Sequence, residues 1–382
     1  MIKLVTMTNT KLIAITANTS WYLFNFRSNL IKALIAEGYN VLAIAPADDY
    51  SERLSKIGNQ VRFRAIKIDQ GGTNPFRDFL TAVSFFNIYR KERPEIVLNF
   101  TPKNNIYSTL AASRFKIRVI NNVAGLGSVF IDEGYTASIA RWLYQASQKY
   151  ASRIFFQNEE DMNLFLNAKL VDTYKTERLP GSGVDLTRFT IAPLPQENNI
   201  RFILIARLLY EKGIEEYVMA AKALKKKFPQ VECRLVGFLD MKNPSAIPRH
   251  VIDAWHQSGY INYRGSTDQI EEEISQAHCI VLPSYYREGV PRSLLEGAAM
   301  GRVVITTRNV GCQETVEHGK SGYLCEPRDC TSLLNAMESA IHLSREELNK
   351  MAINSRELVE KKFDEKIVIN RYLNCVNNRK TE

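Results

Sequence analysis

Short apolar runs alternate with longer amphipathic segments along most of this sequence. Runs with the length of buried strands occupy Leu12–Thr16, Val41–Ala45, Ile96–Asn99, Arg118–Asn122 and Arg153–Gln157. Helical periodicity appears at 22–37, 76–90 and 106–113. Strands that alternate with helices bury both of their faces most easily in a parallel sheet covered by helices. The first half of the chain is therefore predicted to form an α/β domain.

The alternation stops near residue 190 and then begins again. Thr190–Asn199 (TIAPLPQENN) contains two prolines and polar residues without periodicity, which is typical of a linker. Strand and helix signals resume at 202–206, 214–228, 233–236, 251–257, 278–282 and 303–306, and 344–378 predicts two final helices. We expect two Rossmann-like domains that face each other across a cleft, with the last helix able to return to the first domain. The predicted boundaries are 1–185 for the first domain, 186–200 for the linker, 201–362 for the second domain and 363–382 for the C-terminal helix.

Hydropathy and cysteine spacing exclude several protein classes. No apolar run approaches the roughly 20 residues that span a bilayer. The N-terminal stretch 1–20 has one short apolar patch broken by Thr and Asn, which predicts a first strand rather than a signal peptide. The six cysteines show neither CxxC nor zinc-ligand spacing. We therefore expect reduced thiols and a cytoplasmic protein.

The net charge of +9 lies mostly in the first half of the chain. The first 185 residues hold 23 Lys and Arg against 16 Asp and Glu, an excess of 7. The excess gathers at Arg53, Lys56, Arg62, Arg64 and Lys67, at Arg90, Lys91 and Arg93, and at Arg114, Lys116 and Arg118. Such a surface is either simply solvated or lies on anionic lipid. No nucleic-acid-binding motif accompanies the charge, so nucleic acid is not an expected partner.

The stretch Ser284–Gly301 (SYYREGVPRSLLEGAAMG) carries the strongest site signal. It joins the apolar run 278–282 to a helix that begins near Arg292. Pro291 suits the first position of that helix because its φ angle is already helical. A helix N-terminus at the end of a strand offers unpaired N–H groups to a phosphate.

Two carboxylates and two cations accompany this helix start. Glu288 precedes the helix and Glu296 lies one turn inside it. Carboxylates beside a phosphate would repel it unless they bind hydroxyl groups, which a sugar or a ribose offers in pairs. Arg207 and Lys212, which follow the strand 202–206, could neutralise a diphosphate. The combination predicts a sugar-nucleotide site.

These motifs resemble the retaining GT-B glycosyltransferases of family 4, also called glycosyltransferase group 1. The resemblance rests on the E-x7-E motif EGVPRSLLE, on ARLLYEKG with its basic pair, on GSGVDLTRF, on TTRNVGCQETVEHGKSGYL and on SWYLFNFRSNLIKAL. It covers nearly the whole chain and is closest to the bacterial branch that builds capsule, lipopolysaccharide or lipid-linked oligosaccharide, in which N-acetylgalactosaminyltransferases occur. It implies transfer of a hexose or N-acetylhexosamine, with GalNAc favoured, from a UDP-sugar to a polyprenyl-pyrophosphate-linked saccharide. The implied location is peripheral, on an anionic membrane surface at the inner face of the cell membrane.

The resemblance also implies roles for individual residues. Arg207 and Lys212 would bind the donor diphosphate, Glu288 would meet the donor sugar hydroxyls near the reacting carbon, and Glu296 would bind both ribose hydroxyls. The segment Gly289, Val290, Pro291, Arg292 and Ser293 would meet the sugar and phosphate, and the base would lie near Gly237, Arg264 and Gly265. Transfer would retain the anomeric configuration by front-side attack. Neither a cofactor nor a metal is expected, since no Asp-x-Asp motif is present and the two cations can offset the leaving-group charge.

The first domain departs from the family pattern at two places. Its first strand is followed by Ala17, Asn18, Thr19 and Ser20 in place of a glycine-rich turn, and all five histidines fall in the second half of the chain. Asn18 and Ser20 are still predicted at the donor. Lys103, Asn104, Asn122 and Gly125 are predicted on the acceptor side. Asn18, Lys103, Asn104 or Asn122 could replace the missing histidine.

Three other functions remain compatible with parts of the pattern. A sugar-nucleotide 2-epimerase has a similar architecture but would act on the UDP-sugar alone. A nucleotide-binding scaffold would bind UDP without chemistry. An NAD enzyme fits least, because no G-x-G-x-x-G follows the first strand.

Overall fold

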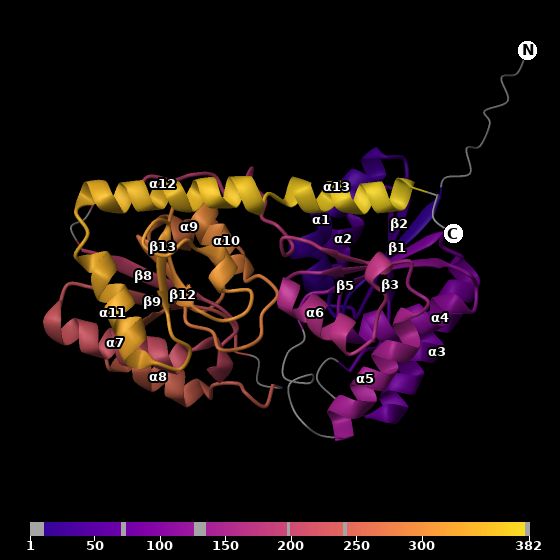
Figure 1. Cartoon of the computed structure of the whole chain (residues 1–382), viewed down its shortest axis with the longest axis horizontal. Helices are drawn as coiled ribbons and strands as arrows, with labels where there is room; N and C mark the ends of the chain where they lie inside the picture. Colours follow the sequence, from indigo (N-terminus) through magenta and orange to yellow (C-terminus); the bar gives the residue numbers. More distant parts are fainter. Residues whose placement is uncertain (1–10, 70–73, 126–134, 197–198, 240–242, 379–382) are drawn as a thin grey trace, which may run out of the picture. The chain divides into compact units, whose positions relative to one another are not determined.

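The computed structural model describes residues 11–69, 74–125, 135–196, 199–239 and 243–378. The chain divides into two compact units (Figure 1). Unit 1 comprises Met1–Ala124, Val129–Leu179 and Ile369–Glu382, and unit 2 comprises Gly125–Ser128 and Pro180–Val368. The segment 186–200, predicted as a linker, belongs to unit 2, where Phe189 and Leu194 are buried in the core. Residues 1–10 of the predicted first domain, 197–198 of the predicted linker and 379–382 of the predicted C-terminal helix lie outside the described ranges.

Unit 1 contains a parallel sheet with the strand order β3-β2-β1-β4-β5-β6-β7. Its strands are β1 (Leu12–Thr16), β2 (Asn40–Ala45), β3 (Val61–Ala65), β4 (Ile96–Asn99), β5 (Arg118–Val123), β6 (Arg153–Phe156) and β7 (Thr176–Arg178). Its helices are α1 (Ser20–Ala36), α2 (Ser51–Ser55), α3 (Pro75–Glu92), the π-helical η1 (Asn104–Ser108), α4 (Thr109–Ser113), α5 (Tyr135–Gln148), α6 (Glu159–Asn167) and the 3-10 turn η3 (Thr173–Lys175).

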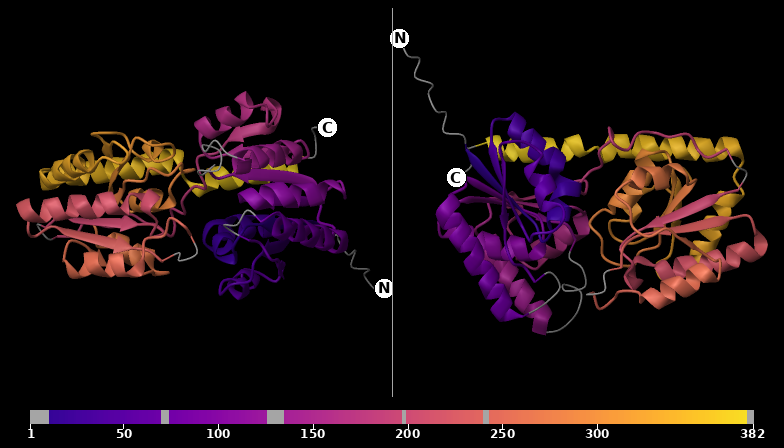
Figure 2. Two further views of the ribbon diagram at one scale, coloured as in Figure 1. Left: turned by 90° about the horizontal axis from the view of Figure 1, so that it is seen from below. Right: turned by 180° about the vertical axis from the view of Figure 1, so that it is seen from behind.

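Helices cover both faces of the unit 1 sheet. In the ribbon views, α1 and α2 lie on one face, and α3, α4 and α5 lie on the other (Figure 1, Figure 2). The central strand β4 is buried at every position, as a strand between two helical layers must be. The predicted α/β class with parallel sheets is confirmed.

Unit 2 contains a second parallel sheet, with the order β10-β9-β8-β11-β12-β13. Its strands are β8 (Arg201–Ile205), β9 (Glu232–Val236), β10 (Asn262–Tyr263), β11 (Cys279–Leu282), β12 (Val303–Thr307) and β13 (Gly322–Cys325). Its helices are η4 (Tyr210–Lys212), α7 (Ile214–Lys227), α8 (Arg249–Gln257), α9 (Ile270–Ser275), α10 (Arg292–Ala299), η5 (Gln313–Thr315), α11 (Cys330–Ile341) and α12 (Arg345–Lys362). The core forms where β8, β11 and β12 pack between α7 with α11 on one side and α10 with α12 on the other.

The last helix, α13 (Glu365–Asn377), belongs to unit 1 from Ile369 onward. Its Tyr372 is buried and packs against Phe100 and Phe155, with ring centroids 5.6 Å and 4.9 Å away. The side-chain amide of Asn122 donates a hydrogen bond to the Tyr372 hydroxyl at 2.8 Å. The predicted return of the C-terminal helix to the first domain is therefore correct. Within the described ranges, no helix is both long and apolar enough to cross a bilayer.

Candidate functional site

The loop between β11 and α10 contains the predicted carboxylate motif. α10 starts at Arg292, and Pro291 is the N-cap residue before it, one position earlier than predicted. Proline has neither an N–H group nor a side-chain acceptor, so Pro291 cannot cap the helix that it precedes. The N–H groups of the first turn of α10 can therefore donate to an anion.

The same loop is fixed to the ends of the two strands beside β11. The N–H groups of Tyr285 and Tyr286 both donate to the carbonyl of Glu211, at 3.1 Å each. The side-chain amide of Asn309 donates to the carbonyl of Tyr286 at 2.6 Å. Glu211 follows β8 and Asn309 follows β12, and these strands flank β11 in the sheet. The carboxyl ends of three adjacent strands thus set the position of this loop, where ligands bind in open α/β sheets.

Glu288 and Lys212 form an ion pair at this edge of the sheet. Their side chains are only 12% and 11% exposed, so water and salt screen the pair weakly. The Ser284 hydroxyl donates to Glu288 Oε1 at 3.0 Å. The Lys212 ammonium lies 5.0 Å from the ring centroid of Tyr286. The structure therefore brings two of the predicted residues into direct contact and adds Ser284 and Tyr286 beside them.

Arg207 lies near the same tyrosine. It follows β8 and its side chain is exposed. Burial raises the pKa of Tyr286, the Glu288 carboxylate adds to this effect, and the Arg207 guanidinium opposes it. Both charges are therefore close enough to act on one phenol. Arg207, Lys212 and Glu288 converge at the carboxyl ends of β8 and β11.

Glu296 lies on α10 with a side chain that is 12% exposed. Arg292 donates a hydrogen bond from Nε to Glu296 at 3.2 Å. Burial raises the pKa of Glu296, whereas Arg292 and Arg188 oppose the rise. Arg188 precedes β8 and pairs with Glu271 of α9. A buried carboxylate flanked by two guanidinium groups can accept hydrogen bonds from a pair of hydroxyls.

The residues predicted near the base also lie together. The N–H group of Gly237 donates to the carbonyl of Gly265 at 2.8 Å, and the Tyr263 hydroxyl donates to the carbonyl of Gly237 at 3.0 Å. A Cβ atom at Gly237 would stand 1.8 Å from the Ala206 carbonyl oxygen, so only glycine fits there. Ala206 directly precedes Arg207. The predicted diphosphate and base regions are therefore adjacent at the carboxyl ends of β8 and β9.

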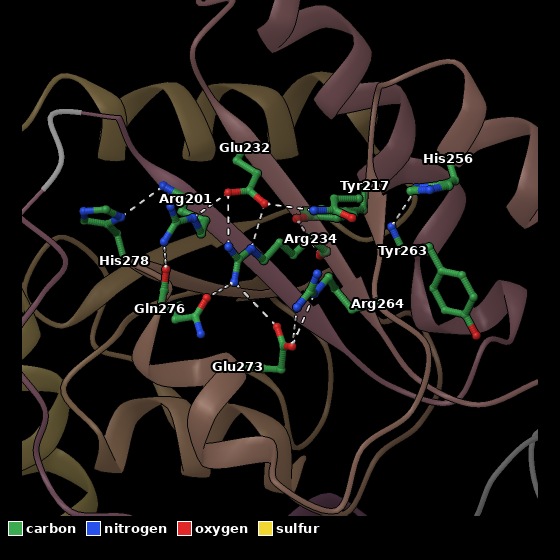
Figure 3. A network of polar contacts seen from close by, with 11 residues as sticks. Arg201, Tyr217, Glu232, Arg234, His256, Tyr263, Arg264, Glu273, Gln276 and His278 are labelled. Atoms are coloured by element: carbon green, nitrogen blue, oxygen red, sulfur yellow. Dashed lines mark hydrogen bonds and ion pairs between the residues drawn. The ribbon is translucent and has the colours of Figure 1, made fainter.

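Arg264 belongs to a network of ion pairs and hydrogen bonds (Figure 3). Arg264 pairs with Glu273 at 3.3 Å, and Glu273 also faces the buried Arg234 at 3.6 Å. Arg234 in turn pairs with Glu232 at 2.8 Å and bonds Gln276 at 2.8 Å. Burial opposes ionisation of Glu232, but hydrogen bonds from Arg234, Asn262 and Arg201 lower its pKa to about 2. Glu232 therefore stays ionised at neutral pH, and the network connects β9, β10 and α9.

Two family models match the chain. The model described as Glycosyl transferases group 1 matches residues 189–358, and the model described as Glycosyl transferase 4-like matches residues 12–158. The chain belongs to the glycosyltransferase group 1 family. The predicted family and the GT-B fold class are confirmed.

Two relatives of this glycosyltransferase carry names that contain a lipid-linked diphosphate sugar. One is the N,N'-diacetylbacillosaminyl-diphospho-undecaprenol alpha-1,3-N-acetylgalactosaminyltransferase of Campylobacter jejuni, 27% identical over 92% of this chain and 94% of that protein. Another is the UDP-Gal:alpha-D-GlcNAc-diphosphoundecaprenol alpha-1,3-galactosyltransferase of Escherichia coli, 23% identical over 75% of this chain and 76% of that protein. The crystal structure of HepE from Anabaena in complex with UDP and glucose has a TM-score of 0.76 at 17% identity and covers 96% of this chain and 99% of its own. The last likeness supports the fold.

Predicted donor residues of unit 1 lie at the start of α1. Ser20 is buried, and its hydroxyl donates to the carbonyl of Pro46 at 2.7 Å. Thr19 caps the helix with its side chain, and Asp48 accepts a further N–H from the first turn at 3.0 Å. Protein acceptors thus take up N–H groups that a glycine-rich turn would leave to a phosphate. Donor roles for Asn18 and Ser20 in this glycosyltransferase stay predictions.

The predicted acceptor residues have different surroundings. Lys103 pairs with Asp78 of α3. Asn104 begins the π-helix η1 and is buried, and its Oδ1 accepts from Thr101 at 2.7 Å. Its Nδ2 has no partner within the described part of the chain. Gly125 follows β5 with a φ of 128°, and the residues after it, 126–134, lie outside the described ranges.

Asn122 serves the interior of unit 1. Its Nδ2 donates to the Tyr372 hydroxyl, and its Oδ1 accepts from Gln157 Nε2 at 3.1 Å. Both ends of the amide therefore hold protein partners, which position α13 on the sheet. An acceptor role for Asn122 would require these bonds to break.

Unit 1 contains a row of buried polar residues that was not predicted from the sequence. Thr16 donates to Asn99 at 2.6 Å, Asn99 donates to Asn121 at 2.8 Å, and Asn121 donates to Gln148 at 2.7 Å. Thr16 and Asn99 are the last residues of β1 and β4, and Asn121 lies in the second half of β5. Single asparagines at strand ends gave no signal, because only strand pairing makes them neighbours.

Proposed function

We propose that this glycosyltransferase moves a hexose or N-acetylhexosamine, with GalNAc favoured, from a UDP-sugar to a lipid-pyrophosphate-linked saccharide. The carrying observation is the convergence of Arg207, Lys212 and Glu288 beside the uncapped start of α10. Cations and helix N–H groups suit a diphosphate, and a carboxylate among them suits sugar hydroxyls. The names of the two relatives support the acceptor class, since both contain a lipid-linked diphosphate sugar.

In this proposal, Arg207 and Lys212 bind the donor diphosphate and Glu288 binds hydroxyls of the transferred sugar. The Lys212–Glu288 pair must then loosen, because the diphosphate competes with the carboxylate for the same ammonium. Glu296 binds the ribose hydroxyls. The base lies near Gly237, Arg264 and Gly265, with the donor spanning the ends of β8, β9 and β11.

We place the chemistry on the donor itself. The acceptor hydroxyl attacks the anomeric carbon from the face that the diphosphate leaves, and a phosphate oxygen takes the hydroxyl proton. The C–O bond to UDP breaks as the new glycosidic bond forms, so the anomeric configuration is retained. Negative charge develops on the diphosphate as it departs. The positive charges of Arg207 and Lys212 stabilise this negative charge, which lowers the barrier without a metal.

The acceptor class also suggests a location. A lipid-pyrophosphate-linked saccharide stays in the membrane, so its transferase has to work at the bilayer surface. The excess of 23 Lys and Arg over 16 Asp and Glu in residues 1–185 suits an anionic inner leaflet. We therefore infer a peripheral protein on the inner face of the cell membrane, without nucleic acid as a partner.

Transfer assays with purified full-length protein test this function. UDP-GalNAc, UDP-Gal, UDP-GlcNAc and UDP-Glc are offered with a polyprenyl-diphosphate-linked sugar, and product configuration is determined by NMR. We expect one donor to dominate, a retained configuration, undiminished turnover in EDTA, and turnover lowered at least about a hundredfold in Arg207→Ala and Glu288→Gln.

The alternatives give different results in the same assay. Conversion of the UDP-sugar to an isomer without acceptor would indicate a 2-epimerase. UDP binding without transfer or hydrolysis would indicate a scaffold. Wild-type turnover in both variants would refute the site, and an inverted product would refute the mechanism.

A further inference from the structure

One helix of unit 1 is apolar on two opposite sides. α3 buries Thr81, Phe85 and Tyr89 against the rest of the unit. Its opposite side exposes Phe76, Phe79, Leu80, Val83 and Phe86. At about 100° per residue, these five side chains fall in one stripe roughly 120° wide, centred opposite the buried stripe. We call this stripe the α3 apolar face.

The exposure of the α3 apolar face is large. Phe76 and Phe79 are 69% and 63% exposed, and Val83 and Phe86 are each 37% exposed. Phenylalanine is seldom left in water at this level, and here five large apolar side chains are contiguous on about three turns of helix. A contiguous patch of this kind marks an interaction surface rather than scattered surface residues.

A second helix of unit 1, α5, also exposes large apolar side chains. α5 exposes Ile139 (54%) and Trp142 (64%), which are three residues apart and share one side of the helix. α3 and α5 both pack against η1, on the face of the sheet away from α1 and α2 (Figure 1, Figure 2). Exposed tryptophan and phenylalanine side chains are typical of protein surfaces that sit at a lipid–water boundary.

Basic residues border one end of the α3 apolar face. Phe86 stacks on Phe115 with centroids 4.9 Å apart, and the Arg93 guanidinium lies 4.5 Å from the Phe115 centroid. Exposed cations near this end are Arg90, Lys91, Arg93, Arg114 and Lys116.

The acidic groups of α3 are neutralised. Asp78 pairs with Lys103, and Glu92 pairs with Arg62 and Arg64. Apolar side chains bordered by exposed cations suit an anionic bilayer better than a protein surface of mixed charge.

We propose that the α3 apolar face inserts into the interfacial region of an anionic bilayer while its basic end binds lipid headgroups. The proposal deepens the proposed function, which requires a membrane-bound acceptor, by assigning the surface that contacts the membrane. The buried stripe of α3 keeps the helix attached to unit 1, so only the outer side chains enter the lipid. The helix then lies parallel to the membrane plane, as amphipathic interfacial helices do.

Vesicle flotation of the full-length protein tests the assignment. Vesicles of phosphatidylcholine, with and without phosphatidylglycerol, are used without donor or acceptor sugar. We expect the wild type to float with the phosphatidylglycerol vesicles and added salt to weaken this binding. The double variant Phe76→Ser/Phe79→Ser should bind at least about tenfold more weakly, because it removes two apolar side chains from the lipid. Arg90→Gln/Lys91→Gln should reduce both the binding and its salt dependence.

The matched control is Met219→Ser/Ile353→Ser, which removes two apolar side chains of unit 2 that are 55% and 50% exposed. It should float like the wild type. Equal flotation of the Phe76/Phe79 double variant and the wild type, or no flotation of the wild type, would overturn the proposal. A wild-type dimer that the Phe76/Phe79 double variant converts to a monomer, without vesicle binding, would assign the surface to a second copy of the chain instead.

A second measurement does not depend on loss of binding. In Phe79→Trp, lipids with brominated acyl chains should quench the fluorescence of the introduced tryptophan, whereas in Ile353→Trp they should not. Absence of extra quenching in Phe79→Trp would contradict insertion. Since neither experiment contains a sugar nucleotide, its failure leaves the transferase assay untouched, and a failed transferase assay leaves the vesicle result standing.

Discussion

Glu288 contacts both the Lys212 ammonium and the Ser284 hydroxyl. A bound donor diphosphate would weaken the first contact but not the second. A diphosphate competes with the carboxylate for the ammonium. The hydroxyl does not compete, because as a donor it can stay bonded to Glu288 throughout. If Glu288 binds the donor sugar as proposed, the Ser284 hydroxyl can help to keep its carboxylate oriented while the ion pair loosens.

Removing this hydroxyl should lower catalysis without unfolding the protein. In Ser284→Ala we expect kcat/KM to fall about 10- to 150-fold, the effect of one hydrogen bond to a charged group. Steady-state kinetics with the preferred UDP-sugar provide the measurement. Ser258→Ala is the control, since it removes a serine hydroxyl that donates to a backbone carbonyl, that of Trp255 in α8, and not to a carboxylate. Equal kinetics in the two variants would remove Ser284 from the site.

Donor binding should also weaken as the pH falls. An ionised Glu296 can accept hydrogen bonds from both ribose hydroxyls, whereas the protonated form loses acceptor capacity. Burial raises the pKa of Glu296 above its ordinary 4.5, so the loss should begin at a higher pH than for an exposed carboxyl. Calorimetric titration with UDP measures this. Glu296→Gln should bind more weakly at neutral pH and show a flatter pH profile, and an unchanged profile would argue against the ribose role.

At the scale of elements, close backbone packing fixes the shape of the loop between β11 and α10. Gly311 has a φ of 77°, and a Cβ atom there would stand 1.8 Å from the carbonyl oxygen of Gly289. Gly213, the N-cap residue before α7, has a φ of 73°, and a Cβ atom there would stand 2.1 Å from the Pro283 carbonyl oxygen. The loop before α10 therefore rests directly on two glycine backbones, so its shape depends on them.

Comparison of Gly311 with Gly319 distinguishes the effect of close packing from the effect of a positive φ angle. Gly311→Ala should destabilise unit 2 by about 3 kcal/mol or more and reduce UDP affinity, because the Gly289 backbone has to move. Gly319 has a similar φ of 74° but nothing within 4 Å of its virtual Cβ. Gly319→Ala should cost about 1 kcal/mol and leave UDP binding unchanged. Urea unfolding and UDP titration compare the two, and equal losses would show that conformational strain alone decides.

Predictability from sequence differed between central and edge elements. The strand predicted at Ile96–Asn99 was confirmed as β4, because a strand buried on both faces is continuously apolar. The edge strand β3 was missed, since Arg62 and Arg64 alternate with its apolar residues and are exposed. The short β10 gave no signal in two residues. The helix over α3 was predicted, but periodicity cannot tell which apolar stripe the fold will cover.

The same limit applies to the donor site. Glu288, Glu296, Arg207 and Lys212 could be predicted because each pair lies within one short segment of the sequence, and their donor roles stay predictions. Arg188 was not, because its approach to Glu296 depends on packing between α9, α10 and the segment before β8. Residues that meet only through tertiary structure leave no pattern in a single sequence.

At the scale of the whole molecule, one buried histidine should couple stability to pH. His278 accepts a hydrogen bond at Nδ1 from the Arg201 N–H at 3.1 Å, and burial lowers its pKa from 6.5 to about 4. Below pH 6.5 the unfolded chain binds a proton that the folded chain refuses. Stability should therefore fall by about 2 kcal/mol between neutral pH and roughly pH 5. Urea midpoints measure the loss, and His278→Asn, which keeps an acceptor that does not titrate, should show a smaller one.

The C-terminal helix contributes to the core of unit 1 through Tyr372. Tyr372→Ala removes its packing on Phe100 and Phe155 and should destabilise unit 1 by about 3–5 kcal/mol. Tyr372→Phe keeps the ring, loses the hydrogen bond from Asn122, and should cost about 1 kcal/mol. Hydrogen exchange of unit 1 strands distinguishes the two. Equal exchange in Tyr372→Ala and the wild type would mean that α13 is dispensable.

Because α13 joins unit 1 only from Ile369, unit 1 is assembled from the two ends of the chain. On the ribosome, its sheet emerges first but waits for about 190 further residues before Tyr372 arrives. At typical elongation rates of about 5–20 residues per second, this delay lasts on the order of 10–40 seconds. Unit 2 is synthesised in the interval, and its last residue, Val368, directly precedes the part of α13 that completes unit 1. The core of unit 1 should therefore stay incomplete until nearly all of unit 2 has been made, and a chain cut short before α13 should leave an unfinished core for chaperones and proteases to recognise.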